Sequence, residues 1–243
     1  MFSVVLSIIL LIRLRCGNKI EIYEYINKRY GGDVKNSVRQ YENISKKLEK
    51  NKLDLDFLIK CKTYHVFPKY QAPVFYKLKD EIRLNLFQYG LVPSWSKEAK
   101  LKFSTHNARI ESVGEKPTWK RPFLSMHCVV PVSQFMEPIR EGDYAGNEVS
   151  FKRKDRKLLF AAGIFDLWKS AENKIRSFAI LTKEASDFVR KVGHQREPVF
   201  IDQNSIQSWL SHSDSLKDTI EVLRNCNIEN DYTVTTIREL KSK

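Results

Sequence analysis

From residue 61 onward the chain is built of short runs in which apolar and polar positions alternate or apolar residues cluster. Such runs are typical of strands, because successive side chains of a strand point to opposite faces of a sheet. The predicted strands are 65–67, 73–78, 82–90, 128–137, 149–153, 157–168 and 177–182. Proline cannot donate to a strand ladder, so turns or edge strands are expected at Pro68, Pro73, Pro93, Pro117, Pro122 and Pro131.

Helical spacing of apolar residues is found before and after these runs. Residues 20–30 are followed by Gly31 and Gly32, and the charged stretch 34–60 predicts one or two solvated helices. Residues 185–193 and 204–212 also predict helices, whereas 234–240 could form a last strand or a helix. These elements together predict one α+β domain with a twisted, mostly antiparallel, barrel-like sheet and peripheral helices.

The first fifteen residues, MFSVVLSIILLIRLR, are apolar and end in arginine. The apolar run is too short to span a bilayer, which takes about 20 residues, and its positive charge follows the run instead of preceding it as in a signal peptide. Three interpretations stay open: a misassigned start codon, a removable propeptide, or a weak anchor, in that order. We therefore expect an extension over 1–15 and a domain over 16–243, with stable membrane association not expected.

Composition narrows the class of protein. Hydrophobic residues make up 42% of the 243 positions, a globular and not a disordered balance. The formal net charge of +13 favours an anionic partner, of which nucleic acid is the usual one, although a generally basic surface would give the same number. Four widely spaced cysteines form no CxxC pair, so the sequence suggests neither a zinc site nor a disulfide framework.

Several polar residues stand where they are candidates for chemistry. Glu137 ends an apolar run, and a half-buried carboxyl there would have a raised pKa suited to acid–base work. His194 follows a predicted helix, and Asn107 lies in the segment NARIES. Trp95 is either a core residue or a stacking platform for a base. Taken singly, each also has an ordinary structural explanation: a surface carboxylate, a structural histidine or a core tryptophan.

Several short segments, taken together and in sequence order, resemble the SOS response-associated peptidase (SRAP) family from about residue 16 to about 215. The segments that carry the resemblance are RCG, HVFPKYQAPVF, YGLVPSWSK, NARIES, RPF, CVVPVSQFME, FAAGIFDLW, ILTKEA and GHQREPVFI. The resemblance implies an α+β fold with a barrel-like sheet. It also implies a protein that binds single-stranded DNA and captures abasic sites in a covalent crosslink, without a cofactor or a metal. A monomer located in the cytoplasm, at the nucleoid, is expected.

The resemblance also assigns roles to individual residues. Cys16 matches the family's reactive N-terminal cysteine, Asn107 the asparagine that hydrogen-bonds the opened sugar, Glu137 the catalytic glutamate, and His194 the histidine of the H-x-R-x-P segment. Contacts with DNA are implied for four further residues: phosphate contacts for Arg109 and Arg196, and wedge or stacking contacts near the lesion for Pro68 and Trp95.

The chemistry requires a free amine and a thiol on one residue. An α-amine has a pKa near 8, against about 10.4 for lysine, so about a tenth of it is neutral at pH 7 and can form an imine with an aldehyde. The thiol of the same cysteine can then close a thiazolidine ring, and proximity favours that step. While residue 15 is attached, the nitrogen of Cys16 is an amide and cannot react, so we expect the active form to begin at Cys16, by self-cleavage or otherwise.

The sequence departs from the family pattern in several places. Arg15 stands where the family has Met, Asn18 replaces the arginine of Cys-Gly-Arg, and Pro138 replaces the common tryptophan after the glutamate. The charged stretch 34–60 resembles an insertion. Two alternatives stay open: a cysteine hydrolase or peptidase that uses Cys16 or Cys128 with His194, and a non-catalytic module that binds single-stranded DNA.

Overall fold

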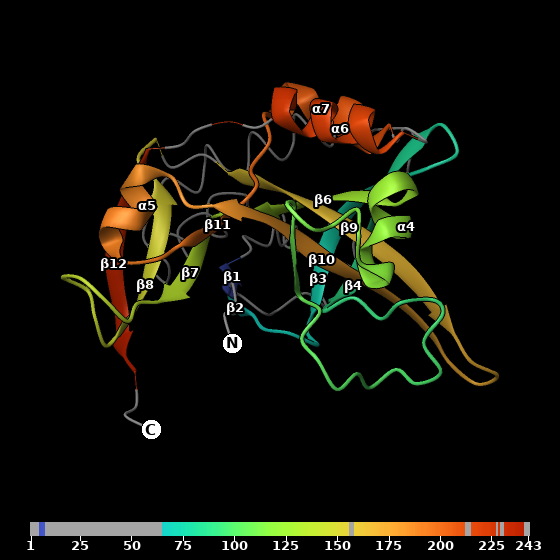
Figure 1. The fold of residues 1–243 in the computed structure, drawn as a ribbon, viewed down its shortest axis with the longest axis horizontal. Coiled ribbons are helices and arrows are strands. Elements are labelled where there is room, and N and C mark those ends of the chain that lie inside the picture. The colour runs from blue at the N-terminus through green and yellow to red at the C-terminus, as the bar shows by residue number, and fades with distance from the viewer. Residues whose placement is uncertain are drawn as a thin grey trace, which may run out of the picture.

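In a computed structural model, residues 5–7, 65–155, 158–211, 215–226, 228 and 231–240 are described. Five strands form a closed ring in the order β10-β4-β3-β6-β9, because β9 also pairs with β10 (Figure 1). Their bounds are Gln71–Leu78 (β3), Glu81–Tyr89 (β4), His127–Val132 (β6), Leu159–Lys169 (β9) and Lys174–Glu184 (β10). All neighbours in the ring are antiparallel except β4 and β10, which pair in parallel.

Two short strands extend β10 beyond the ring. β5 (Asn107–Arg109) pairs with it in parallel, and β11 (Arg196–Pro198) pairs with it antiparallel. The two registers meet at one residue, since Thr182 lies opposite both Arg109 and Pro198. The far end of β10 therefore brings the NARIES segment and the H-x-R-x-P segment, which are far apart in sequence, to the same place in the fold.

A second sheet has five antiparallel strands in the order β12-β8-β7-β1-β2. Their bounds are Val5–Ser7 (β1), His65–Val66 (β2), Gln134–Pro138 (β7), Asn147–Arg153 (β8) and Tyr232–Glu239 (β12). Only Ser133 separates β6 of the ring from β7 of this sheet. The chain thus passes directly from the barrel wall into the second sheet. β7 begins at Gln134, three residues before Glu137.

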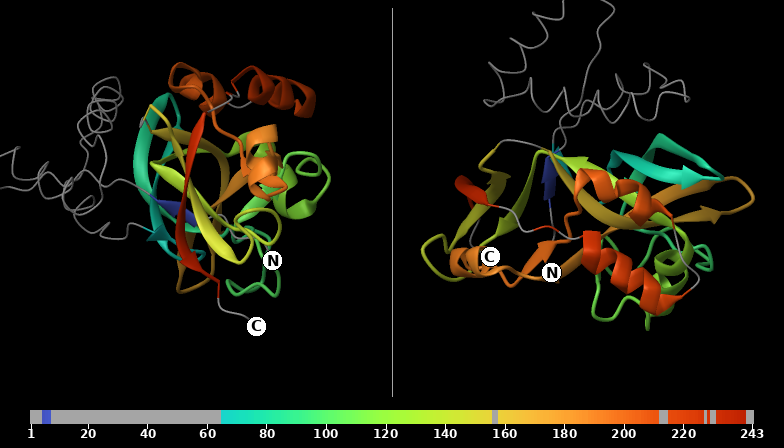
Figure 2. Two further views of the ribbon diagram at one scale, coloured as in Figure 1. Left: turned by 90° about the vertical axis from the view of Figure 1, so that its left-hand side faces the viewer. Right: turned by 90° about the horizontal axis from the view of Figure 1, so that it is seen from above.

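The described helices lie around the sheets. Their bounds are Pro117–Ser125 (α4), Asp187–Val192 (α5), Gln203–Ser205 (η1, a 3-10 turn), Ile206–Leu210 (α6) and Leu216–Cys226 (α7). The helices α4, α6 and α7 cover the barrel, and α5 lies beside the second sheet (Figure 2). The ring of Phe188 in α5 contacts that of Tyr232 in β12 at a centroid distance of 6.2 Å. No helix among these is long and apolar enough to cross a membrane.

Aromatic side chains fill the space between the sheets and the barrel interior. Phe135 and Phe151 stack at 4.6 Å between ring centroids on the inner face of the second sheet. Under the helices, the ring of His127 stacks on that of Trp209 at 4.0 Å, and both ring nitrogens face carbonyl oxygens, at 2.7 and 2.6 Å.

The predicted α+β fold with a barrel-like, mostly antiparallel sheet is confirmed. The predicted strand 128–137 is divided at Ser133 into β6 and β7, and 234–240 forms a strand. The prediction for two prolines was wrong: Pro117 and Pro122 lie in helix α4, where Pro117 occupies the first turn and its missing N–H costs nothing. The helix at 216–226 was not predicted. The insertion 34–60 lies outside the described residues, as does the extension 1–15 apart from β1.

Candidate functional site

Two buried ionisable side chains face each other between the second sheet and the end of α5. Glu137 in β7 is 0% exposed and His194 is 3% exposed. The Oε2 atom of Glu137 lies 3.4 Å from Nε2 of His194. Within the described part of the chain, neither carboxyl oxygen of Glu137 accepts a hydrogen bond of good geometry. Buried carboxyls are normally hydrogen-bonded, so this one is a candidate for contact with a substrate.

Burial moves both groups toward their neutral forms. The pKa of Glu137 is raised well above its ordinary value of 4.5, first by burial and then by the negative charge of Glu148. The pKa of His194 is lowered from 6.5 mainly by burial; the hydrogen bond to the backbone of Arg196 offsets part of this, and the positive charge of Arg196 adds a smaller lowering. Burial thus favours the neutral form of each group, and a carboxyl and an imidazole that lie side by side in this way are suited to proton transfer.

The backbone fixes the orientation of His194. Helix α5 ends at Gly193 in the left-handed conformation, with φ of 109°, and a β-carbon there would collide with the carbonyl oxygen of Glu141. Directly after this turn, Nδ1 of His194 lies 2.6 Å from the carbonyl oxygen of Arg196. The backbone N–H of Arg196 also faces Nδ1, at 3.4 Å, but the shorter contact is with a carbonyl, which only accepts, so it favours a proton on Nδ1 and the lone pair of the neutral ring on Nε2, toward Glu137.

Asn107 enters the same region from β5. Its Oδ1 atom lies 3.0 Å from the hydroxyl of Tyr89 at the end of β4. The Tyr89 ring is buried, stacks on Phe178 at 5.1 Å and meets His106 edge-on. The pKa of Tyr89 is raised by burial and, second, by the negative charge of Glu137, so the phenol lies within electrostatic reach of that carboxyl. Tyr89 thus contacts Asn107 directly, and Glu137 acts on it through its charge.

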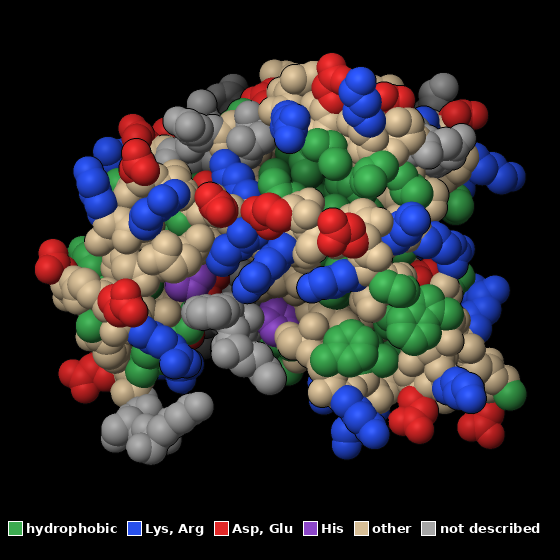
Figure 3. All heavy atoms as spheres, in the orientation of Figure 1, with side chains coloured by type: hydrophobic (Ala, Val, Ile, Leu, Met, Phe, Trp, Pro, Cys, Tyr) green, Lys and Arg blue, Asp and Glu red, His purple; other side chains and the backbone are tan. Residues whose placement is uncertain are grey.

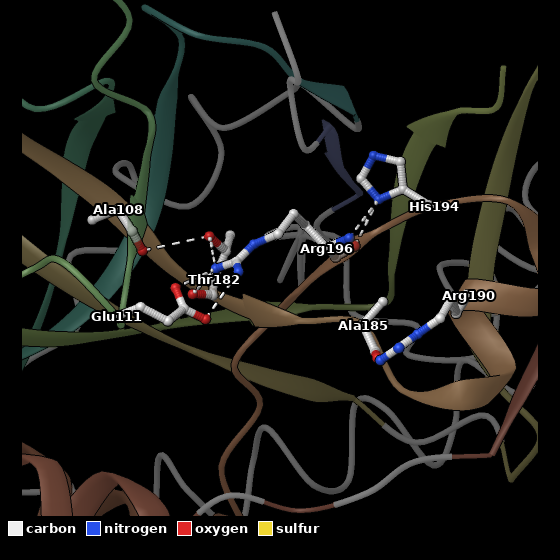
Figure 4. Close-up of polar contacts among 7 residues, drawn as sticks. All are labelled: Ala108, Glu111, Thr182, Ala185, Arg190, His194 and Arg196. Carbon is white, nitrogen blue, oxygen red and sulfur yellow. Dashed lines mark hydrogen bonds and ion pairs between the residues drawn. The ribbon is translucent and has the colours of Figure 1, made fainter.

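The guanidinium of Arg196 is held by other protein groups. Nη1 donates to Oε1 of Glu111 and Nη2 donates to Oε2, each at 2.9 Å. Nη2 also donates to the carbonyl oxygen of Thr182 at 2.7 Å (Figure 4). Burial raises the pKa of Glu111, but the hydrogen bond and charge of Arg196, together with backbone hydrogen bonds, outweigh this, and the net pKa is lowered. A phosphate would have to displace Glu111 to reach this fork, so the geometry favours a role in joining β5 to β11.

The other predicted arginine is placed differently. Arg109, at the end of β5, is exposed, and within the described residues its side chain makes no hydrogen bond or ion pair. Lys and Arg side chains gather across the middle of one face of the molecule, near two places where histidine reaches the surface (Figure 3). Arg109 is thus available to an anionic ligand in a way that Arg196 is not.

Trp95 lies on a loop whose neighbouring residues, Ser94 and Ser96, are hydrogen-bonded to the rest of the protein. Its side chain is 58% exposed. The buried carboxylate of Asp166 accepts a hydrogen bond from the backbone N–H of Ser94 at 2.8 Å, and the guanidinium of Arg121 donates to the Ser94 hydroxyl at 2.6 Å. The indole of Trp168 donates to the carbonyl oxygen of Ser96 at 2.8 Å. These contacts on both sides hold Trp95 outward on a fixed segment.

Pro68 lies at a tight turn between β2 and β3. It is half-buried and is flanked by Phe67 and Tyr70, which are 37% and 46% exposed and meet edge-on at 5.7 Å. Lys69 follows with φ of 78°, a conformation that non-glycine residues seldom adopt and that often marks a functional turn. The backbone N–H of Lys69 donates to the carbonyl oxygen of Tyr89, at 2.6 Å. The turn therefore contacts the end of β4, where Tyr89 meets Asn107.

The structure brings Glu137 and His194 into contact, and it brings Asn107 into contact with Tyr89, whose pKa the charge of Glu137 raises. Cys16 lies outside the described residues. Sequence reasoning did not find Tyr89, Glu111 or Asp166, although each lies in a segment already singled out (YGLVPSWSK, NARIES and FAAGIFDLW). Phe103 is another exposed aromatic side chain, at 52%, that was not singled out. In the described ranges no group of three His, Cys, Asp or Glu side chains is arranged to hold a metal ion.

Cys128 has none of the properties of a nucleophile. It is fully buried in β6, and burial raises its thiol pKa well above 9.0. Its Sγ atom lies so close to Gly163 of β9 that a β-carbon at Gly163 would approach it to 2.9 Å. The thiol stays protonated and inaccessible, so the hydrolase alternative cannot use Cys128.

Fold and site together define an α+β barrel protein with a buried acid–base pair. Residues 35–240 match the profile of the family described as SOS response associated peptidase (SRAP), and the chain belongs to this family. The chain is 27% identical over 162 residues to the abasic site processing protein YoaM of Bacillus subtilis (66% of this chain, 71% of that protein). It is 28% identical over 190 residues to the abasic site processing protein HMCES of Rattus norvegicus (62% of this chain, 53% of that protein).

Solved structures share the fold. A crystal structure of a protein from Bacteroides thetaiotaomicron superposes with a TM-score of 0.64 at 21% identity, covering 81% of this chain and 88% of that one. One from Bordetella bronchiseptica superposes with a TM-score of 0.61 at 23% identity, covering 72% of this chain and 88% of that one. The architecture described above is therefore also found in crystal structures.

We predict that the free energy of unfolding of Glu137→Gln, compared with that of wild type, is more favourable to the variant at about pH 8 than at about pH 5. Because burial raises the pKa of Glu137 above 4.5, its protonated form stabilises the fold fully below that pH, and the stability is lost as pH rises through the folded-state pKa. Glutamine cannot ionise and avoids that loss. Urea denaturation of both proteins at the two pH values measures the difference, and a difference that does not change with pH would contradict the raised pKa.

We predict that Asp166→Ala loosens the Trp95 loop. The substitution leaves the N–H of Ser94 without its acceptor, so amide exchange at Ser94 should accelerate by about tenfold or more. Hydrogen exchange resolved by residue measures this. The matched control is Glu98→Ala, because Glu98 is exposed and contributes only its backbone carbonyl to the loop contacts that the structure describes. Equal exchange rates in the two variants would remove Asp166 from this role.

Proposed function

We propose that this protein captures abasic sites in single-stranded DNA as a covalent thiazolidine crosslink through Cys16, once Cys16 has become the N-terminal residue. Membership of the SRAP family and the names of the curated relatives, abasic site processing proteins, support the reaction class. The observation that carries the proposal is the buried Glu137, which lacks a hydrogen-bond partner of good geometry among the described residues and lies 3.4 Å from His194.

The covalent steps balance without a cofactor. The amine of Cys16 attacks the aldehyde carbon of the ring-opened sugar, and loss of water gives an imine. The thiol then adds across the carbon–nitrogen double bond: sulfur bonds to the carbon, and the thiol proton goes to the nitrogen. The product is a five-membered ring that joins the cysteine to the sugar. Both nucleophiles are on one residue, so the second step is intramolecular and benefits from high effective concentration.

Glu137 and His194 supply the proton transfers. A protonated Glu137 gives its proton to the ring oxygen of the sugar as the ring opens, or to the hydroxyl that leaves as water. A neutral His194, with its lone pair on Nε2, accepts a proton from the reacting amine or holds the hydroxyl that ring opening produces. Burial raises the pKa of Glu137 and lowers the pKa of His194, so it favours these starting forms of both groups.

DNA is bound by residues that surround the pair. Exposed Arg109 contacts a phosphate, and the half-buried Pro68 and the exposed Trp95 support the bases that flank the lesion. Arg196 keeps the role that its contacts indicate, which is to tie Glu111 and Thr182 together. The net charge of +13 adds salt-dependent attraction for the backbone.

Exposure of Cys16 requires cleavage of the bond after Arg15, or a start of translation close to Cys16. In the first case Glu137 and His194 are the groups that would assist hydrolysis, in which water is added across the 15–16 peptide bond. Residues 5–7 form β1 and pair with β7 on one side and β2 on the other, so the segment before Cys16 reaches the strand that carries Glu137. Cleavage that removed β1 would leave β7 and β2 without the strand that lies between them.

The decisive experiment uses protein that begins at Cys16 and a single-stranded oligonucleotide with one abasic site. We expect an adduct that survives a denaturing gel, with a mass equal to protein plus DNA minus one water. Cys16→Ser keeps the amine but lacks the thiol, so it should form an imine that disappears on the gel unless it is first reduced. Intact mass of the native protein shows whether residues 1–15 are present.

Three controls separate this proposal from its alternatives. DNA without an abasic site should give no adduct, and N-terminal acetylation of Cys16 should abolish it. A non-catalytic binding module would bind DNA with no covalent band, and a cysteine hydrolase would turn over a peptide substrate instead. Wild-type protein starting at Cys16 that binds the damaged DNA yet forms no adduct would end the proposal.

We predict that Arg109→Ala and Arg196→Ala have different effects. Arg109→Ala removes one phosphate contact and should weaken DNA binding while reducing the slope of log affinity against log salt by about 0.7, with little change in stability. Arg196→Ala removes the bidentate side-chain donor of Glu111 and one of the two donors to the Thr182 carbonyl, which keeps the backbone N–H of Ile110, and it should destabilise the fold by about 1–3 kcal/mol. Fluorescence anisotropy across salt concentrations and urea denaturation distinguish them. The reverse pattern would reassign the phosphate contact to Arg196.

A further inference from the structure

We propose that the hydroxyl of Tyr89 is a positioning group that fixes the side-chain amide of Asn107 for the opened sugar. This inference rests on the proposed function, because it assigns Asn107 its task. The sequence resemblance points to Asn107 but names no residue that orients it. The geometry points to Tyr89, whose hydroxyl lies 3.0 Å from Oδ1 of Asn107 across an 18-residue separation in sequence.

The hydrogen bond determines which way the amide faces. The phenol donates to Oδ1, so the Nδ2 group of Asn107 is turned away from Tyr89 and keeps both of its N–H donors for another acceptor. A hydroxyl or carbonyl oxygen of a ring-opened sugar is such an acceptor. Without the phenol, the side chain of a half-buried asparagine can turn its oxygen toward the sugar, which offers no donor where one is needed.

Tyr89 itself is held rigidly. Its ring is buried against Phe178, with an interplanar angle of 23°, and against the edge of His106. Its backbone N–H donates to the carbonyl oxygen of Tyr70 at 2.8 Å, and its carbonyl accepts from Lys69. Contacts on the ring and on the backbone leave the hydroxyl in one position, which is what a group must have if it is to orient another.

Asn107 needs such a partner because its own strand is short. β5 comprises three residues and pairs with β10 through Ile180, Leu181 and Thr182. The backbone of Asn107 is fixed by this ladder, but its side chain can still rotate. One hydrogen bond from a rigid donor removes that freedom before DNA arrives, so the ordering cost is not taken from the crosslinking reaction.

The test is a double-mutant cycle on the single-turnover crosslinking rate, using protein that begins at Cys16. Tyr89→Phe removes one oxygen and keeps the buried ring. We expect it to slow crosslinking by about fivefold in the wild-type background, with DNA affinity changed by less than about twofold. In the Asn107→Ala background, Tyr89→Phe should have no further effect, because the group that it orients is gone. A merely structural role would slow both backgrounds equally.

The matched control is Tyr76→Phe. Tyr76 is another barrel tyrosine, 7% exposed and packed against Phe87 and Phe165, so it undergoes the same chemical change away from Asn107. It should crosslink at the wild-type rate. Thermal melting of all variants shows whether each is folded. Equal rates for Tyr89→Phe and wild type, or equal slowing in both backgrounds, would overturn the inference.

A second readout does not depend on activity. In nuclear magnetic resonance, the Asn107 side-chain amide of the wild type should show a high order parameter, and Tyr89→Phe should lower it while Tyr76→Phe does not. Unchanged order in Tyr89→Phe would overturn the positioning role even if the wild type crosslinks. A wild-type protein that shows this ordering but forms no adduct would count against the proposed function and leave Tyr89 as the group that orients Asn107.

Discussion

The buried carboxyl of Glu137 is the constraint on which the rest of the site depends. It lies in β7, just after the chain leaves the barrel wall at Ser133, and its oxygens accept no hydrogen bond of good geometry from the described residues. Such a group is costly to bury in its charged form, so burial raises the pKa of Glu137, and burial likewise lowers the pKa of its neighbour His194. The fold maintains this arrangement by holding each partner on a rigid element: a strand for Glu137, and a helix end closed by Gly193 for His194.

The two arginines illustrate how alike residues acquire different roles. Arg109 and Arg196 stand at equivalent positions of two N/H-x-R segments. Strand pairing places Arg109 opposite Thr182 of β10, whereas Arg196 is paired with Glu184 and reaches the Thr182 carbonyl through its guanidinium. Arg196 is enclosed by Glu111 and the Thr182 carbonyl, whereas Arg109 extends from the end of its strand toward solvent. The enclosed one joins the segments around β5 and β11, and the exposed one is accessible to an anionic ligand. Each arginine lies two residues after the Asn or His of its segment, so the spacing does not distinguish them. Only the residues that contact each arginine do.

Most of the fold could be predicted from alternation of apolar and polar residues, because each strand has one face in a core. The division of 128–137 at Ser133 could not, since a continuous apolar run gives no sign that two sheets share it. The site residues Asn107, Glu137 and His194 were predicted by resemblance, not by periodicity. Tyr89 was missed because its hydroxyl meets Asn107 only after β4 and β5 both align with β10. Helix α4 was missed because Pro117 and Pro122 suggested turns.

The parallel contact between β4 and β10 also bears on how the protein folds as it is synthesised. This contact closes the ring by pairing Tyr89 with Phe178, and no local hairpin can make it. The β3–β4 and β9–β10 hairpins can form early, but closure must bring together chain segments separated by a long loop, which is entropically costly and slow. His194 follows β10 in the chain, so a nascent chain has no acid–base pair until nearly all of the barrel has left the ribosome. A reactive cysteine at the other end of the chain would therefore meet its proton-transfer groups only in the completed molecule.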